Sequence, residues 1–155
     1  MKQRTWFSLA ILFLFLCARR EHPEHPKENL KPKQFSVADL EKAIKKNIAE
    51  QSKATNGIFE IYDPELKKTW KLTLVRVHTD RLSKVGPGMY FACVDMKDPS
   101  GKTIDVDFFL RPKNGKLEMS DVTVHKVEGK PRYNWKEEKG FWKRVPVGSS
   151  VTEQR

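Results

Sequence analysis

The sequence predicts an α+β domain, in which one N-terminal helix packs on an antiparallel meander of five to six strands. Apolar residues recur at spacings of three and four between residues 37 and 48, as they do on one face of a helix. After Gly57, short runs of alternating apolar and polar residues stand between turn signals, as in antiparallel strands.

The first 17 residues are predicted to form a secretory signal segment. Two basic residues among the first five precede an almost entirely apolar stretch over residues 6–16. This stretch is shorter than the ~20 residues that span a bilayer. The segment from Leu14 to Cys17 resembles a bacterial lipobox, which implies lipid attachment at Cys17, although Leu16 stands where that pattern has a small residue. Cleavage after Ala18 is the alternative.

Residues 18–34 are predicted to form an extended linker, because they hold three prolines, alternating charges and almost no apolar side chain. His22 and His25 lie in this segment and are interpreted as part of the linker rather than as a metal site. The folded domain is predicted to cover residues 35–136, followed by a C-terminal tail over residues 137–155.

The chain is basic, with 30 Lys and Arg against 20 Asp and Glu and a formal net charge of +10. Within residues 36–135, however, 18 basic side chains are mixed with 14 acidic ones instead of forming the stripe typical of nucleic-acid binding. The charge therefore favours solubility and loose attraction to anionic surfaces, and no nucleic-acid partner is predicted.

The helix is predicted to begin after Ser36, whose hydroxyl can cap the first turn together with Asp39. Phe35 precedes the cap and can pack on Leu40. The helix is predicted to end near Lys53, before an Asn-Gly turn. One apolar stripe runs along it and requires a sheet to cover it: Val37, Leu40, Ile44 and Ile48.

Six strands are predicted, at residues 58–62, 69–79, 89–97, 103–111, 116–127 and 130–136. After residue 98, Pro99 excludes a type I′ turn and favours a three-residue loop closed by Gly101. This loop determines a register in which every pair on one face is apolar, with Tyr90, Ala92, Val94 and Met96 opposite Leu110, Phe108, Val106 and Ile104. That face is the predicted core.

The same reasoning extends the core face over the later strands. A three-residue loop at residues 113–115 places Val122 opposite Val106. A tight turn before the last strand then places Tyr133 and Trp135 beside this part of the core face.

The opposite, outer face is the candidate functional surface. Its apolar end is predicted to be covered by Phe141 and Trp142 of the tail. At its polar end the predicted register pairs Asp95 with Asp105 and Asp107 with Asp121, an arrangement that a cation or basic ligand would stabilise. A solvated sheet face is the alternative, and no metal or other cofactor is predicted. The candidate ligand-binding residues are Asp95, Asp105, Asp107, Asp121, His125 and Arg132.

Cys93 and His125 raise the alternative of a hydrolase with a thiol nucleophile and an imidazole base. The predicted register separates them by roughly 16 Å, which is too far for proton transfer. His78 is an alternative base in place of His125, because the strand register around His78 is not determined by the sequence. A catalytic role is therefore not predicted.

The order of elements over residues 36–136 resembles that of the cystatin-like and NTF2-like families and of uncharacterised bacterial envelope lipoproteins. The resemblance implies a two-layer sandwich of helix and sheet. The Gln-x-Val-x-Gly segment of inhibitory cystatins is absent from the sequence, so protease inhibition is not implied.

Together these features predict an exported protein, in the periplasm or anchored to a membrane by lipid. Its predicted role is to bind an unknown protein or peptide partner of the cell envelope without catalysis. A small Cys/His hydrolase and an envelope protein that binds divalent cations are the alternatives.

Overall fold

The computed structural model describes residues 34–80 and 83–148. The predicted signal segment with Cys17, and residues 18–33 of the predicted linker, lie outside these residues. The elements are α1 (Val37–Gln51), a 3-10 turn (Lys53–Thr55), β1 (Phe59–Asp63), β2 (Lys68–Val77), β3 (Ser83–Gly86), β4 (Met89–Lys97), β5 (Thr103–Lys113), β6 (Lys116–Val127), β7 (Lys130–Pro131), β8 (Tyr133–Glu138) and β9 (Phe141–Pro146).

α1 begins as the sequence predicts. The Ser36 hydroxyl accepts a hydrogen bond from the Asp39 N–H (3.2 Å), and the Asp39 carboxylate accepts one from the Ser36 N–H (2.9 Å). The stripe of Leu40, Ile44 and Ile48 is buried. The cap and the stripe together explain why this segment forms a helix.

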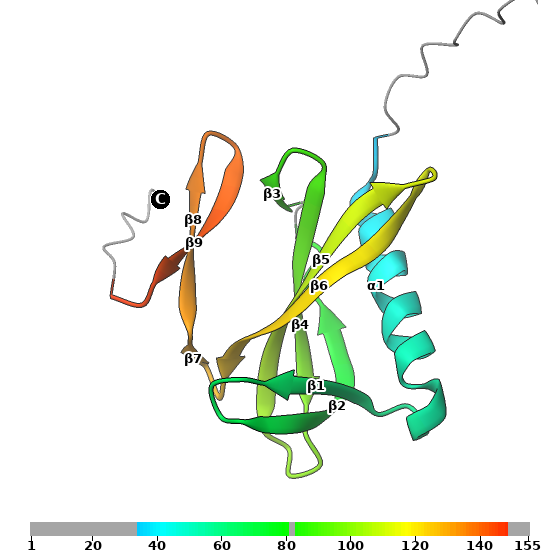
Figure 1. Cartoon of the computed structure of the whole chain (residues 1–155), viewed down its shortest axis with the longest axis vertical. Coiled ribbons are helices and arrows are strands. Elements are labelled where there is room, and N and C mark those ends of the chain that lie inside the picture. The colour runs from blue at the N-terminus through cyan, green and yellow to red at the C-terminus, as the bar shows by residue number, and fades with distance from the viewer. Residues whose placement is uncertain (1–33, 81–82, 149–155) are drawn as a thin grey trace, which may run out of the picture. The chain divides into compact units, whose positions relative to one another are not determined.

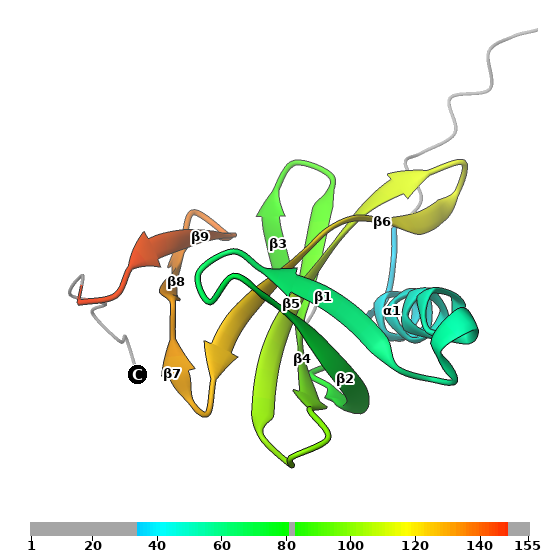
Figure 2. The same ribbon diagram turned by 60° about the horizontal axis from the view of Figure 1, so that its bottom comes forward.

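The strands form one large sheet and one separate hairpin. The sheet has the order β1-β2-β4-β5-β6-β7, with β3 pairing to β4, and β8 pairs only with β9. The large sheet curls like half a barrel (Figure 2), with α1 on one side of it and the β8–β9 hairpin on the other (Figure 1). The predicted α+β class is confirmed, but the described residues hold nine strands rather than five or six.

The predicted register of β4 and β5 is confirmed. Tyr90 pairs with Leu110 and Met96 pairs with Ile104, with the intervening apolar pairs as expected. These side chains are buried together with the α1 stripe in one core cluster. The Pro99 turn therefore determined the alignment of the two central strands.

The turn between β5 and β6 differs from the predicted one. Asn114 (φ 50°) and Gly115 (φ 72°) are both in the left-handed region, and Lys113 pairs directly with Lys116. This is a two-residue connection of the type I′ kind, for which Asn-Gly is the preferred sequence. The predicted three-residue loop was wrong because residue 113 belongs to the strand.

Two β-bulges in β6 add to this shift. Ser120 and His125 are each an extra residue of β6 without a partner on β5. Val106 therefore pairs with Val124, which lies two residues further along β6 than predicted. Between the two bulges the shift equals the side-chain period of a strand, so Val122 and Val124 stay on the predicted core face. Outside the bulges the shift is odd and side chains change face, so Met119 packs against the core. The imidazole of His125 lies closer to Cys93 than the predicted register places it.

The chain after β7 leaves the sheet, which contradicts the single strand predicted over residues 130–136. β8 and β9 form a hairpin that continues to Pro146, beyond the predicted domain end at residue 136. Tyr133 and Trp135 consequently contact residues of the outer face and not the core face. β3 and β9 were not predicted.

Candidate functional site

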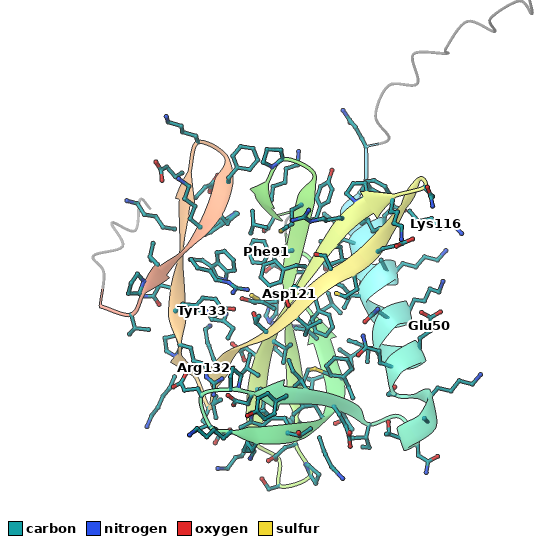
Figure 3. The ribbon with its side chains drawn as sticks, viewed as in Figure 1. Glu50, Phe91, Lys116, Asp121, Arg132 and Tyr133 are labelled. Carbon is teal, nitrogen blue, oxygen red and sulfur yellow. The ribbon has the colours of Figure 1, made fainter. Side chains whose placement is uncertain are left out.

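The β8–β9 hairpin covers the apolar end of the outer face with aromatic side chains. Trp135 stacks on Phe91 at 4.4 Å between ring centroids and lies 6.2 Å from Phe109. The Arg144 guanidinium lies 4.6 Å from the ring centroids of both Phe109 and Tyr133. Figure 3 shows Phe91 and Tyr133 in the space between the hairpin and the sheet. Phe141 and Trp142 were predicted to cover this end, but the contacts come from Trp135 of β8 and Arg144 of β9, and Trp142 lines a pocket together with Phe91.

Asp107 on β5 is fully buried beneath this hairpin. Its Oδ1 accepts a hydrogen bond from the Cys93 thiol (2.7 Å). Its Oδ2 accepts one from the Tyr133 hydroxyl (2.7 Å) and one from the Trp135 indole N–H (3.0 Å). The Nδ1 of His125 lies 3.6 Å from the same Oδ2. Donors from β4 and β8 thus satisfy a carboxylate that would be costly to bury alone.

Cys93 and His125 are neighbours, which corrects the predicted separation. The Cys93 Sγ and the His125 Nδ1 are 3.9 Å apart, whereas the predicted register implies roughly 16 Å. The two-residue turn and the bulges at Ser120 and His125 together account for the difference. The distance therefore no longer excludes a chemical interaction between thiol and imidazole.

The ring orientation of His125 is determined by its other nitrogen. His125 Nε2 lies 3.1 Å from the backbone carbonyl oxygen of Tyr133, which can only accept, so Nε2 carries the hydrogen. The ring also stacks on Tyr133 at 4.6 Å between centroids. The other ring nitrogen, Nδ1, therefore faces Cys93 and Asp107.

The environment keeps Cys93 and Tyr133 protonated. Burial and the adjacent Asp107 carboxylate raise the pKa of the Cys93 thiol, and the same two causes raise the pKa of Tyr133. For Asp107, burial alone raises the pKa, but the hydrogen bond and charge of His125, with hydrogen bonds from Cys93 and Tyr133, outweigh burial and lower it. Asp107 is thus the ionised acceptor of this cluster.

A pocket of about 330 Å³ opens beside Cys93. This volume lies at the lower end of the range for small-molecule sites, about 300–1,000 Å³. Its aromatic lining comes from Phe91, Trp135 and Trp142. Its polar lining includes His78, Asp80, Asp95, Asp105 and Lys126.

The two carboxylates at the polar end face each other as predicted, and each has a basic partner. Asp95 is paired with Asp105 across β4 and β5. Asp95 lies 2.7 Å from His78 Nε2 and 3.6 Å from Arg76 Nε, and Asp105 lies 3.3 Å from Lys126 Nζ. These partners reduce the repulsion between the two carboxylates.

Two of the predicted site residues lie elsewhere. Asp121 is exposed and pairs with Phe109, so it does not face Asp107 as predicted. Arg132 lies beside the β1–β2 hairpin (Figure 3), where it forms an ion pair with Asp63. The predicted carboxylates therefore do not form one cluster, because the register shift removes Asp121 from it.

Arg132 and Asp63 form a buried ion pair that connects β1 to the segment between β7 and β8. Two guanidinium nitrogens of Arg132 each donate to one Asp63 oxygen at 2.6 Å. Asp63 also accepts from the Trp70 indole N–H (2.7 Å) and from the backbone N–H groups of Glu65 and Leu66. Arg132 is therefore a structural residue and not a ligand of the outer face.

Tyr133 and Trp135 are the functional residues that sequence reasoning missed. Their alternation in one strand indicates a shared face but not which face, since both faces of the sheet are partly apolar. Asp63 is recognisable in the sequence only as a turn residue before Pro64. Its distant partner Arg132 has no local signal.

No protein-family model, curated protein or solved structure matches this chain significantly. The resemblance to cystatin-like and NTF2-like domains therefore stays a prediction from the order of elements.

Proposed function

We propose that the protein is a non-enzymatic binding module that holds a small basic group in the pocket beside Cys93. The observation that carries this proposal is the composition of that pocket, with aromatic rings at one end and carboxylates at the other. The basic group can belong to a free organic amine or to a Lys or Arg side chain of an envelope protein or peptide. The recognition chemistry is the same in both cases.

The aromatic lining suits the body of such a ligand. Phe91, Trp135 and Trp142 offer ring faces, which bury apolar surface and also attract cations electrostatically. An organic cation can therefore place its hydrocarbon part against the rings and direct its charge toward Asp95 and Asp105.

The ionisable lining favours a cation over an anion. Three carboxylates, those of Asp80, Asp95 and Asp105, face the pocket together with the single ammonium group of Lys126. Lys126 is itself 3.3 Å from Asp105, so its charge is largely committed to that carboxylate. The lining therefore holds more carboxylates than basic side chains.

A thiol hydrolase is not favoured, although Cys93 and His125 are close. A nucleophilic cysteine needs a lowered pKa, whereas burial and the Asp107 carboxylate raise the pKa of Cys93. Asp107 contacts the sulfur directly at 2.7 Å. A carboxylate in that position would oppose both a thiolate and the oxyanion of an acyl-transfer intermediate.

The export and lipid attachment at Cys17 are part of the same proposal. They are supported by the apolar segment and lipobox-like sequence within residues 1–17, which lie outside the described residues. Within residues 34–80 and 83–148, no helix has the length and apolar character needed to cross a membrane.

Titration of the full-length chain with benzamidine and with benzoate tests the proposed preference. We expect benzamidine to shift the indole N–H signals of Trp135 and Trp142 in NMR spectra and to leave that of the buried Trp70 unchanged. Benzamidine is expected to bind at least about tenfold more tightly than benzoate, a difference of about 1.4 kcal/mol.

Two variants test which carboxylate binds the amidinium group of benzamidine. Asp95→Asn is expected to weaken benzamidine about five- to tenfold, because it removes a charged acceptor. The exposed Asp121→Asn is the matched control and leaves the affinity unchanged. Equal affinities for benzamidine and benzoate, or equal effects of the two variants, would contradict the proposal.

Alkylation of Cys93 distinguishes the binding module from the hydrolase. The full-length Cys17→Ser protein is treated with iodoacetamide at neutral pH, once folded and once unfolded in urea. Cys93 is expected to react at least about a hundredfold more slowly in the folded protein, because only the thiolate reacts and the fold raises the pKa of the thiol. Mass spectrometry over time gives both rates. Rapid modification of the folded protein would support the hydrolase.

A further inference from the structure

We infer that Cys93, Asp107 and His125 form a binding site for a divalent transition-metal ion of the zinc class. The ligand atoms are the Sγ of Cys93, the Oδ1 of Asp107 and the Nδ1 of His125. This inference goes beyond the pocket proposed above, since the pocket lining includes Cys93 but neither of the other two residues.

The three residues come from neighbouring strands and converge on one point. Cys93 on β4 pairs with Asp107 on β5, and the bulge at His125 on β6 brings the imidazole to the same place. One ligand atom from each lies within 4.8 Å of the others. Regular strands hold Cys93 and Asp107, which provides the rigidity that a metal site needs.

The separations are close to those around a tetrahedral zinc ion. Zn–S of about 2.3 Å and Zn–N or Zn–O of about 2.0–2.1 Å place neighbouring ligand atoms roughly 3.3–3.6 Å apart. The Sγ–Nδ1 distance is 3.9 Å, and Nδ1 lies 3.6 Å from Oδ2 of Asp107, the neighbour of the proposed ligand oxygen Oδ1 on the same carboxylate. The Sγ–Oδ1 distance is 2.7 Å and must widen when a cation replaces the thiol proton between the two atoms.

Groups around the ligands already orient them as in a metal site. The Tyr133 carbonyl oxygen accepts from His125 Nε2, which leaves Nδ1 as the donor atom. The Tyr133 hydroxyl and the Trp135 indole N–H both bind Oδ2 of Asp107, so Oδ1 is the oxygen turned to the sulfur. Hydrogen bonds of this kind are typical of imidazole and carboxylate ligands.

Charge also favours a divalent ion at this point. Asp107 and His125 are buried, and Asp107 carries its charge beneath the hairpin. A dication together with the Asp107 carboxylate and a Cys93 thiolate is a neutral group, which is the least costly arrangement in a dry environment.

The donor set selects the class of metal. One thiolate, one imidazole and one carboxylate suit zinc, cobalt(II) and related ions, whereas calcium and magnesium require mainly oxygen ligands. Cys93 is half-buried and lines the pocket, so an ion reaches the site along that side. The same side is where a fourth ligand, such as water, completes the coordination.

Titration of the full-length chain with cobalt(II) tests the site. Cys17→Ser, His22→Gln and His25→Gln are first introduced to remove ligands in the N-terminal segment. We expect one equivalent of cobalt to bind, with a thiolate-to-cobalt charge-transfer band in the near ultraviolet and an increase in melting temperature. Absence of the charge-transfer band in the folded protein would overturn the inference.

Three variants in that background separate ligands from neighbours. Cys93→Ser, which keeps a donor to Asp107, should abolish the band and weaken cobalt more than tenfold. Tyr133→Phe should keep the band but weaken cobalt about tenfold, since it removes a hydrogen bond to a ligand. His78→Gln should change neither. A Cys93→Ser protein that binds cobalt as tightly as its parent overturns the inference.

Discussion

Replacing Asp107 with alanine is expected to destabilise the protein by about 3–5 kcal/mol. Asp107 is fully buried and accepts hydrogen bonds from Cys93, Tyr133 and Trp135. Removal of the carboxylate deprives the part-buried Trp135 N–H of its acceptor and leaves the Tyr133 hydroxyl only Thr123 as a partner. A buried group left unsatisfied costs about 1–3 kcal/mol. The β8–β9 hairpin also loses the anchor that holds it on the sheet.

Urea unfolding followed by circular dichroism measures this effect, with a chelator present so that bound metal does not contribute. Asp107→Asn retains one acceptor oxygen and is expected to lose less stability than Asp107→Ala. The exposed Asp121→Asn, on the adjacent strand, should change the free energy of unfolding by no more than about 0.5 kcal/mol. A similarly small effect of Asp107→Ala would show that the buried network does not stabilise the fold.

Arg132→Leu is expected to cost a similar amount, about 3–5 kcal/mol, because it leaves the Asp63 carboxylate buried without its charged partner. Lys71→Met removes the exposed ion pair with Glu60 in the same β1–β2 hairpin and is the matched control. Exposed pairs of this kind contribute about 0–1 kcal/mol. Equal effects of the two substitutions in urea unfolding would refute a special role for the buried pair.

The same ion pair predicts a pH dependence of stability. Burial by itself raises the pKa of Asp63, but hydrogen bonds from Arg132, Trp70 and Leu66 and the Arg132 charge outweigh burial, so its pKa falls from 3.8 to about 2. At pH values between the folded and the unfolded pKa of Asp63, the unfolded chain binds more protons than the folded chain. Ionisation of Asp63 therefore contributes about 2–3 kcal/mol to the free energy of unfolding above pH 4, and this contribution is lost as the pH falls toward 2.

Unfolding free energies at several pH values between 5 and 2 measure this loss. In Arg132→Leu the Asp63 pKa is no longer lowered by the guanidinium, so this part of the acid sensitivity should become smaller. If the unfolding free energy of Arg132→Leu falls with decreasing pH as steeply as that of the wild type, the acid sensitivity belongs to other carboxylates.

The helix and the two central strands were predictable because their signals are local. The capping box of Ser36 and Asp39 lies within one turn, and Pro99 restricts the loop next to it. Between the two bulges of β6 the register was not predictable from alternation, since a shift of two residues exchanges Val122 for Val124 and leaves the pattern of faces there intact. The Asn114-Gly115 pair indicates the two-residue turn, but the bulges at Ser120 and His125 have no comparable signal.

By itself, the sequence determined the α+β class, the start of α1, the alignment of β4 with β5, and the identity of the outer face that bears Asp107 and His125. The tertiary structure decided that His125 lies beside Cys93, that Arg132 binds Asp63, and that the β8–β9 hairpin covers the outer face. Caps, turns and alternation depend on interactions between residues close in the chain. The candidate site depends instead on strand displacements of two residues and on buried hydrogen bonds between distant segments, and only the assembled fold determines these.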